Sequence, residues 1–225
     1  MTVDDVVVRS TAEEAAHEAA GRLARAAALG GAIALAGGAT PRRAYELAAA
    51  IQPDWSRASV WWGDERCVPP EDRRSNFLLA REALLSRLRG RPEVHRIHGE
   101  LGPEAAADEY DRELEGVTLG LVLLGLGPDG HTASLFPNSP ALAVQDRRAV
   151  AADAALEPLV PRVTLTLPAL AAAQEILFLV TGAEKGDAAY SAFRGRPGPE
   201  TPASLVRSSA GSTIAVLDAA AAGRF

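Results

Sequence analysis

Short apolar runs alternate with longer segments of helical spacing along the whole chain, and this alternation constrains the fold most strongly. Strands are predicted at residues 6–8, 32–36, 59–63, 119–125, 162–167, 175–181 and 212–218. Helices are predicted at residues 11–28, 41–51, 75–88, 103–115, 183–193 and 202–208, with a short one between 167 and 175. The pattern predicts an α/β fold with a doubly wound, mostly parallel sheet flanked by helices, in one domain spanning 1–225.

Charge and composition narrow the classes of partner. The net charge is −6, and the chain lacks a basic run, which argues against nucleic acid and against an anionic membrane surface. No apolar stretch approaches the roughly 18 residues of a spanning helix, and residues 1–5 lack the pattern of a signal peptide. The single cysteine, Cys67, excludes an internal disulfide. We therefore expect a cytoplasmic protein, either a monomer or a weak homo-oligomer.

The carboxyl ends of parallel strands meet at one edge of a sheet, so the loops after residues 36, 63, 125 and 181 should share a rim. The first loop, residues 37–41, has the sequence Gly-Gly-Ala-Thr-Pro. Glycines allow close approach of a ligand, and the following helix presents free amide hydrogens to an anion. Thr40 suits the N-cap and Pro41 the first helical position. The loop is either a phosphate cradle or an ordinary strand-to-helix turn.

The second rim loop, residues 61–69, has the sequence Trp-Trp-Gly-Asp-Glu-Arg-Cys-Val-Pro. Asp64, Glu65 and Arg66 follow the strand end directly and suit a site that orients a charged substrate. The alternative is a solvated loop with surface ion pairs. Cys67 has no histidine nearby in the sequence, so an incidental thiol is favoured over a nucleophile.

The third rim loop contains His131, in the run Leu-Gly-Leu-Gly-Pro-Asp-Gly-His-Thr-Ala-Ser-Leu-Phe-Pro. Asp129, two residues earlier, can orient the imidazole as a general base. Residues 125–130 match GxGxxG, but the prolines that follow oppose the helix that a dinucleotide site requires. His95 and His98 lack the acids or cysteines that would complete a metal site, so no metal and no cofactor are predicted.

Two basic residues stand near the remaining strands. Of 23 basic residues, 22 are arginine, and Lys185 is the sole lysine. This bias predicts that Lys185 has a role that arginine cannot fill. Arg162 begins a predicted strand, and either side chain can pair with phosphate.

Together these segments resemble the 6-phosphogluconolactonase family, which is related in fold to glucosamine-6-phosphate deaminases and isomerases. The resemblance spans essentially the whole chain. Its markers are residues 37–41, Asp-Glu-Arg-Cys-Val-Pro at 64–69, Ser-Asn at 75–76, Gly-Pro-Asp-Gly-His-Thr-Ala-Ser-Leu-Phe-Pro at 127–137, Arg-Val-Thr-Leu-Thr at 162–166 and Gly-Ala-Glu-Lys at 182–185.

The resemblance implies metal-free hydrolysis of 6-phosphogluconolactone to 6-phosphogluconate in the pentose phosphate pathway. By similarity, His131 is the general base, Asp129 orients it, and Arg66, positioned by Asp64, offsets negative charge. The residues implied in substrate or phosphate binding are Gly37, Gly38, Thr40, Arg66, Asn76, Arg162 and Lys185. Ala39 departs from the serine or threonine that often follows the two glycines.

Two rival functions are weighed against this interpretation. Deaminases of this fold use an acid five residues after the loop histidine, where this chain has Phe136, and place Asp-Glu-Tyr where this chain has Asp-Glu-Arg. A non-catalytic sugar-phosphate sensor usually carries a helix-turn-helix, for which we expect no room before the first strand. The presence of both Asp129 and His131 also favours an enzyme.

Overall fold

The computed structural model describes residue 3 and residues 5–225, and its centre is a seven-stranded sheet. All neighbouring strands of this sheet are parallel, which confirms the predicted α/β class. In spatial order the strands are β1 (Asp5–Arg9), β10 (Ser212–Asp218), β9 (Glu175–Val180), β6 (Leu119–Leu124), β2 (Ala32–Leu35), β3 (Ser59–Trp62) and β5 (Glu93–Val94).

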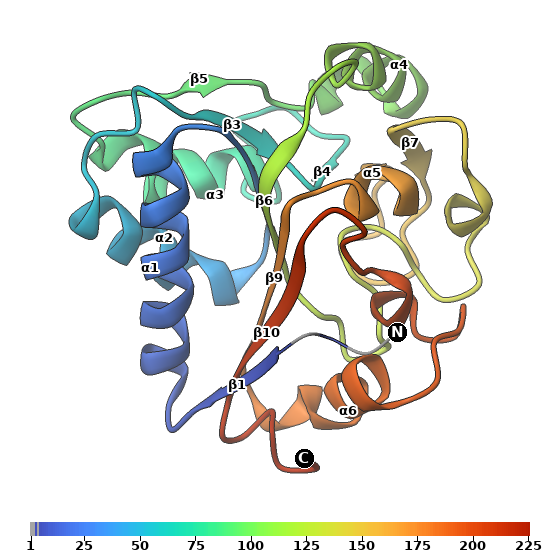
Figure 1. Cartoon of the computed structure of the whole chain (residues 1–225). Helices are drawn as coiled ribbons and strands as arrows, with labels where there is room; N and C mark the ends of the chain where they lie inside the picture. Colours follow the sequence, from blue (N-terminus) through green and yellow to red (C-terminus); the bar gives the residue numbers. More distant parts are fainter. Residues whose placement is uncertain (1–2, 4) are drawn as a thin grey trace.

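Helices cover both faces of this sheet. In Figure 1, α1 (Ala12–Leu29), α2 (Ala39–Ile51) and α3 (Asn76–Ala83) lie on one side, and α5 (Leu167–Ala171) and α6 (Gly186–Arg194) on the other. The remaining α-helix of the described residues is α4 (Pro103–Glu113). Short 3-10 turns lie at Leu85–Arg87, Gly99–Leu101, Pro140–Ala143, Ala183–Lys185 and Pro202–Leu205.

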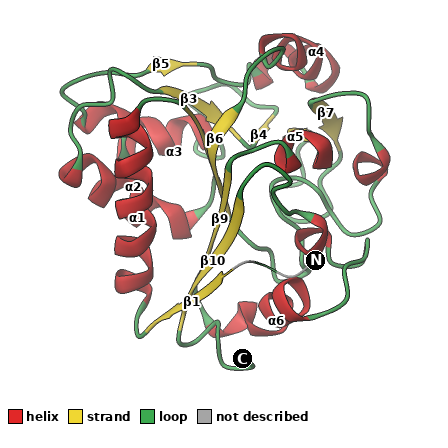
Figure 2. Cartoon of the chain, in the orientation of Figure 1, coloured by secondary structure: helices red, strands yellow, loops and turns green. Residues whose placement is uncertain are grey.

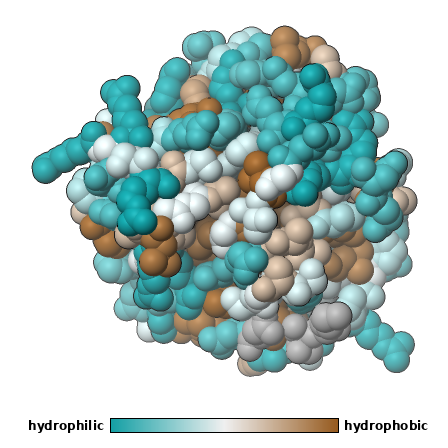
Figure 3. Space-filling view, turned by 45° about the horizontal axis from the view of Figure 1, so that its top comes forward, coloured by the Kyte–Doolittle hydropathy of each residue, from teal (hydrophilic) through white to brown (hydrophobic). Residues whose placement is uncertain are grey.

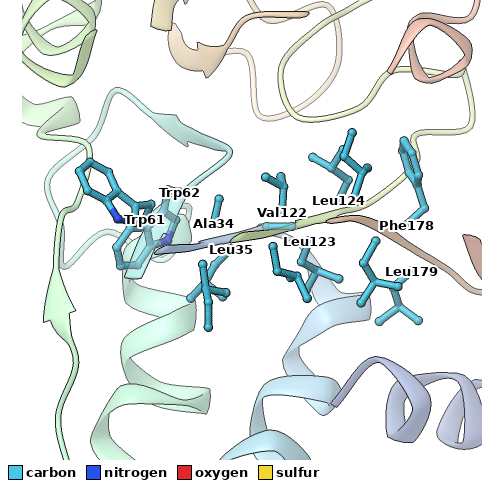
Figure 4. Packing of buried hydrophobic residues seen from close by; sticks show 14 of the residues in the cluster. Ala34, Leu35, Trp61, Trp62, Val122, Leu123, Leu124, Phe178 and Leu179 are labelled. Carbon is cyan, nitrogen blue, oxygen red and sulfur yellow. The ribbon is translucent and has the colours of Figure 1, made fainter. Parts of the chain in front are cut away.

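The apolar strands fit a sheet that is buried on both faces. In Figure 4, Ala34, Val122 and Leu124 point to one side of the sheet, and Leu35 and Leu123 point to the other. All five are nearly inaccessible to solvent. Since each strand needs apolar side chains on both faces, it appears in the sequence as a continuous apolar run without alternation.

The order of the strands creates a crevice at one place. From β2 the chain builds outward through β3 to β5, then returns to β6 on the other side of β2 and builds outward through β9 to β10. Strands β2 and β6 therefore flank the point where the strand order reverses. In open α/β sheets, ligands bind outside the carboxyl ends of the strands at such a point.

A second, three-stranded sheet consists of β4 (Asp64–Arg66), β8 (Arg162–Leu165) and β7 (Ala149–Ala152), all antiparallel. Residues 162–165 therefore belong to this small sheet and not to the parallel one, and β4, β5 and β7 were not predicted. The segment between β6 and β7 is loop except for one 3-10 turn, as Figure 2 shows. These short strands depend on pairing across long loops, which local periodicity does not report.

Several predicted helix boundaries are also wrong. The segment predicted at 75–88 leaves the α-helix at Leu84 and continues as a 3-10 turn, and residues 202–208 form only the turn Pro202–Leu205. Helix α2 begins at Ala39, so its N-cap is Gly38 and not Thr40. Gly38 has a φ of 96°, which glycine adopts without the steric penalty of a side chain.

The surface is largely polar on the face shown in Figure 3. Polar side chains cover much of the face in Figure 3, with smaller apolar patches between them. Within residue 3 and residues 5–225, none of the helices has the length and apolar character needed to cross a membrane.

Candidate active site

An open cleft of about 370 Å³ lies at the carboxyl ends of β2, β6 and β9. The four loops predicted to share a rim all contribute to it, together with a wall from the small antiparallel sheet. The structure brings most of the predicted site residues to its lining: Gly37, Gly38, Thr40, Asp64, Arg66, His131, Arg162 and Lys185.

His131 and Asp129 form a hydrogen-bonded pair on the loop after β6. The Nδ1 atom of His131 lies 2.5 Å from Oδ1 of Asp129, and the His131 backbone N–H donates to the same oxygen at 3.1 Å. With Nδ1–H donated to the carboxylate, Nε2 is the nitrogen that can accept a proton. The ring of Phe136 packs against the imidazole, with centroids 4.7 Å apart. The contacts hold the imidazole in one orientation at the edge of the cleft.

The loop that presents His131 closes on itself. The backbone N–H of Gly127 donates to the carbonyl of His131 at 2.8 Å, and the Thr132 hydroxyl donates to the Gly125 carbonyl at 2.8 Å. A Cβ at residue 127 would lie 2.0 Å from Nδ1 of His131. Only glycine at this position leaves room for the imidazole and its carboxylate partner.

The Gly37–Gly38 loop leads into α2, whose first turn lies at the cleft. The N-cap, Gly38, offers no side chain to bond the first amides of the helix. Those N–H groups and the positive end of the helix dipole can therefore receive an anion. The hydroxyl of Thr40 accepts a long hydrogen bond from Thr181 at 3.4 Å, which links the loops after β2 and β9.

Two arginines form the wall contributed by the small sheet. Arg66 of β4 and Arg162 of β8 are direct cross-strand partners. Arg162 is 4% exposed and donates to the carbonyls of Val160 and Pro158, at 3.1 and 2.8 Å. Burial lowers the pKa of Arg162, and the positive charge of Arg66 lowers it further. Neither guanidinium pairs with a carboxylate of residues 5–225, so both charges are available to an anionic ligand.

Arg66 itself is held by the chain that follows it. Its Nη1 donates to the carbonyl of Arg74, and its buried Nε has no partner among the described residues. A buried, unsatisfied N–H of a charged group is unfavourable. The Arg66 side chain also lines the cleft, where its guanidinium can meet a ligand oxygen.

Asp64 and Asn76 have contacts that differ from those expected. The carboxylate of Asp64 accepts from the Ser134 hydroxyl at 2.6 Å and from Asn76 Nδ2 at 3.2 Å, and no ion pair with Arg66 exists within residues 5–225. Asn76 is 1% exposed and lies behind Gly37, outside the cleft lining. The two side chains therefore hold each other, while the predicted positioning of Arg66 by Asp64 and the predicted substrate contact of Asn76 stay predictions.

Glu65, which was considered from the sequence only as part of the charged run 64–66, is a buried acid. Its carboxylate accepts from the backbone N–H groups of Asn76 and Phe77, both at 2.7 Å, and from the Ser75 hydroxyl at 3.0 Å. Burial raises the pKa of Glu65, and these backbone hydrogen bonds act in the opposite direction. Glu65 caps the start of α3 from ten residues away, which a local capping pattern does not reveal.

Lys185 lies at the rim that follows β9, at the end of the turn Ala183–Lys185. Its ammonium makes no ion pair with the carboxylates of residues 5–225. The turn is anchored by Asp218, whose carboxylate accepts from the Gly182 backbone N–H at 3.1 Å. Lys185 therefore adds a third unpaired cation to the cleft.

The other reactive residue types lie outside this cleft. His95 contacts Glu93 and Glu113 at 3.1 and 3.6 Å, and His98 contacts Glu109 at 2.8 Å. Both histidines thus join the β5 segment to acids, two of which lie on α4. Burial raises the pKa of Cys67 to about 11, which keeps this thiol protonated and fits the incidental role predicted for it.

Comparison with known proteins agrees with this arrangement. Residues 4–215 match the family model described as glucosamine-6-phosphate isomerases/6-phosphogluconolactonase. The 6-phosphogluconolactonase of Nostoc sp. is 40% identical over 172 residues, covering 72% of this chain and 70% of that protein. The 6-phosphogluconolactonase of Synechocystis sp. is 38% identical over 202 residues, covering 84% of this chain and 82% of that protein.

Solved structures show the same fold. The 6-phosphogluconolactonase of Thermotoga maritima has a TM-score of 0.83 at 30% identity and covers 95% of this chain and 99% of its own. The 6-phosphogluconolactonase of Trypanosoma cruzi has a TM-score of 0.88 at 25% identity, and the match covers 100% of this chain and 98% of that one. A monomeric glucosamine-6-phosphate deaminase shares the fold at a TM-score of 0.85 and 19% identity, and the match covers 97% of this chain and 99% of that one.

Proposed function

Because the chain belongs to the glucosamine-6-phosphate isomerase/6-phosphogluconolactonase family, we propose that it hydrolyses 6-phosphogluconolactone to 6-phosphogluconate in the oxidative pentose phosphate pathway. The observation that best supports this function is the His131–Asp129 pair at a cleft lined by three unpaired cations. The pair suits activation of water, and the cations suit a substrate that carries a phosphate.

His131 acts as the general base in this proposal. Nε2 takes a proton from water as the water oxygen attacks the lactone carbonyl carbon. The tetrahedral intermediate then collapses, the bond to the ring oxygen breaks, and the imidazolium returns the proton to that oxygen. The Asp129 carboxylate stabilises the transient imidazolium. General-base assistance of about 10²–10⁴-fold is a large gain for a lactone, which is an activated ester.

The cations and the α2 amides divide the negative charge between them. The phosphate is held by the Gly37–Gly38 loop with Thr40, and by Arg162 and Lys185. Arg66, with its unsatisfied Nε, offsets charge on the substrate or on the tetrahedral intermediate. One donor aimed at a developing oxyanion contributes about 3–4 kcal/mol.

The deaminase activity of related folds is the second candidate, and the surroundings of His131 argue against it. Phe136 occupies the position of the deaminase acid, and its ring is 3% exposed and packed on the imidazole. The carboxylate nearest in sequence is Asp129, which is bonded to Nδ1. No acid of residues 132–145 follows the histidine to exchange a proton with a second substrate carbon.

The test compares two substrates on the purified protein. Hydrolysis of freshly generated 6-phosphogluconolactone is followed through proton release, with the spontaneous rate subtracted, and ammonia release from glucosamine 6-phosphate is followed in parallel. The proposal expects lactone turnover well above the spontaneous rate and no ammonia. Robust ammonia release, or a lactone rate equal to the spontaneous one, would overturn it.

A further inference from the structure

One face of the β4–β8 pair carries four polar side chains in two rows. Alternate residues of a strand share a face, so Asp64 and Arg66 point the same way from β4, and Arg162 and Thr164 the same way from β8. The antiparallel register places Asp64 opposite Thr164 and Arg66 opposite Arg162. The face therefore has a cationic half, formed by Arg66 and Arg162, next to a second half formed by Asp64 and Thr164.

Ser134 is bonded to both members of the second half. Its hydroxyl donates to Oδ2 of Asp64 at 2.6 Å, and its backbone N–H donates to Oγ1 of Thr164 at 3.1 Å. Ser134 and Thr164 are fully buried. Ser134 follows His131 by three residues. These two bonds therefore attach the loop that contains His131 to β4 and β8, the strands of Arg66 and Arg162.

The backbone of Ala133, between Thr132 and Ser134, indicates that the loop is fixed on both sides. Thr132 bonds to the Gly125 carbonyl at the end of β6, and Ser134 bonds to the small sheet. Ala133, between them, has a φ of 50°. This conformation is unfavourable for an L-residue with a side chain and persists where the surroundings fix the backbone on both sides.

We propose that Ser134 is a positioning residue, an inference that rests on the function proposed above. By bonding to Asp64 and Thr164, Ser134 sets the distance between the imidazole of His131 and the substrate held by Arg66 and Arg162. Asp64 acts here as the acceptor for the base loop and not as a partner of Arg66. Reaction rates depend strongly on such distances, and a displacement of about 1 Å can reduce turnover about 10²-fold.

The first variant is Ser134→Ala, with Ser139→Ala as its matched control. Ser139 lies in the same loop segment, and its buried hydroxyl has no partner among the described residues. We expect Ser134→Ala to lower kcat for the lactone at least tenfold, while KM and the Kd for 6-phosphogluconate stay within about twofold of wild type. Ser139→Ala should match wild type in all three.

The second pair of variants tests the other bond. Thr164→Val removes the acceptor for the Ser134 N–H at nearly constant volume, and Thr164→Ser restores the hydroxyl. Thr164→Val should lower kcat several-fold with binding unchanged, and Thr164→Ser should recover it. Because the first variant removes a donor to a buried carboxylate, the Thr164 pair gives the same readout if Ser134→Ala does not fold.

The outcomes separate this inference from the proposed function. If wild type hydrolyses the lactone but Ser134→Ala and Thr164→Val behave as Ser139→Ala does, the positioning role is wrong and the function stands. If kcat, KM and product affinity all worsen by one common factor, Ser134 supports the fold only, and the positioning role is again wrong. If wild type itself does not exceed the spontaneous rate, the proposed function fails, and this inference fails with it.

Discussion

The cleft is formed by two regions that are built in opposite ways. The rim of the parallel sheet contributes backbone groups and His131 from loops that depend on glycine, at Gly38 and Gly127. The small antiparallel sheet contributes Arg66 and Arg162 from short, largely buried strands. The first region presents the His131 imidazole, the helix amides and the Lys185 ammonium, and the second presents the two guanidinium groups.

The two regions also differ in whether their polar and charged groups have partners within the fold. The His131 loop is satisfied within the fold: His131 has Asp129, and the carbonyls of Gly125 and His131 accept from the Thr132 hydroxyl and the Gly127 backbone N–H. In the wall Arg162 is buried and Arg66 is partly buried, and neither has a carboxylate partner among residues 5–225, which is unfavourable for Arg162 until an anion arrives. The His131 loop of the rim should therefore control the rate of the chemical step, and Arg162 of the wall should mainly control substrate affinity, at some expense of stability.

The largest effect should come from a methyl group placed in the rim. Gly127→Ala puts a Cβ 2.0 Å from Nδ1 of His131 and 2.5 Å from Oδ1 of Asp129. We expect kcat to fall about 10²-fold or more, because the base must move from its place. The control is Gly21→Ala in α1, where nothing lies within 4 Å of the added atom. Unchanged turnover in Gly127→Ala would contradict the rim's role in catalysis.

A change in the wall should separate affinity from turnover. Arg162→Met removes a buried cation while keeping an unbranched apolar side chain. We expect KM to rise about 10–100-fold, since charge-assisted hydrogen bonds contribute about 1.5–3 kcal/mol each, with a smaller change in kcat. The free energy of unfolding should change by no more than about 1–3 kcal/mol, because the loss of the hydrogen bonds to the Val160 and Pro158 carbonyls is offset by removal of a buried cation without a carboxylate partner. Steady-state kinetics and urea denaturation check both parts; a loss of kcat at unchanged KM would reverse the assignment.

A change at Glu65, which holds the start of α3 against β4, should lower the stability of the fold. Glu65→Gln places an amide NH2 group among the backbone N–H groups of Asn76 and Phe77, which need acceptors. We expect the free energy of unfolding to decrease by about 1–3 kcal/mol, measured by urea denaturation. The exposed Glu71, in the loop between Arg66 and α3, provides the control Glu71→Gln. Equal stability of the two variants would show that Glu65 does not hold α3 to β4.

The smallest effect should come from Lys185→Arg at the rim after β9. A flat guanidinium does not replace a compact ammonium in a cleft that already contains two arginines. We expect KM to rise by a few-fold with kcat nearly unchanged. An unchanged KM would mean that arginine can replace Lys185 and that this lysine has no special role.

The sequence predicted the rim much better than the wall. Ala32–Leu35 and Leu119–Leu124 are apolar runs that are followed within two residues by glycine, so the strands and the loops after them can be recognised locally. The three residues of β4, Asp-Glu-Arg, are all charged and resemble a solvated loop. Arg162 was placed in a strand, but its sheet and its partner Arg66 depend on pairing between residues far apart in the chain.

Contacts among buried polar groups were the other gap. Asp64 and Asn76 were both identified as site residues, yet their side chains bond to each other, and Asp64 bonds to Ser134. Motif similarity identifies such residues without showing which of them reaches the ligand. The capping contacts of Glu65 were not predicted, because its partners begin ten residues later in the chain.

The most direct test of the account is His131→Ala, measured for lactone turnover and for binding of 6-phosphogluconate by calorimetry. The account predicts that kcat above the spontaneous rate falls by about 10²–10⁴-fold, while the Kd for 6-phosphogluconate stays within about twofold of wild type, because the arginine wall and the α2 amides are intact. A variant that hydrolyses the lactone as fast as wild type, or that loses binding in step with turnover, would contradict the assignment of His131 as the base.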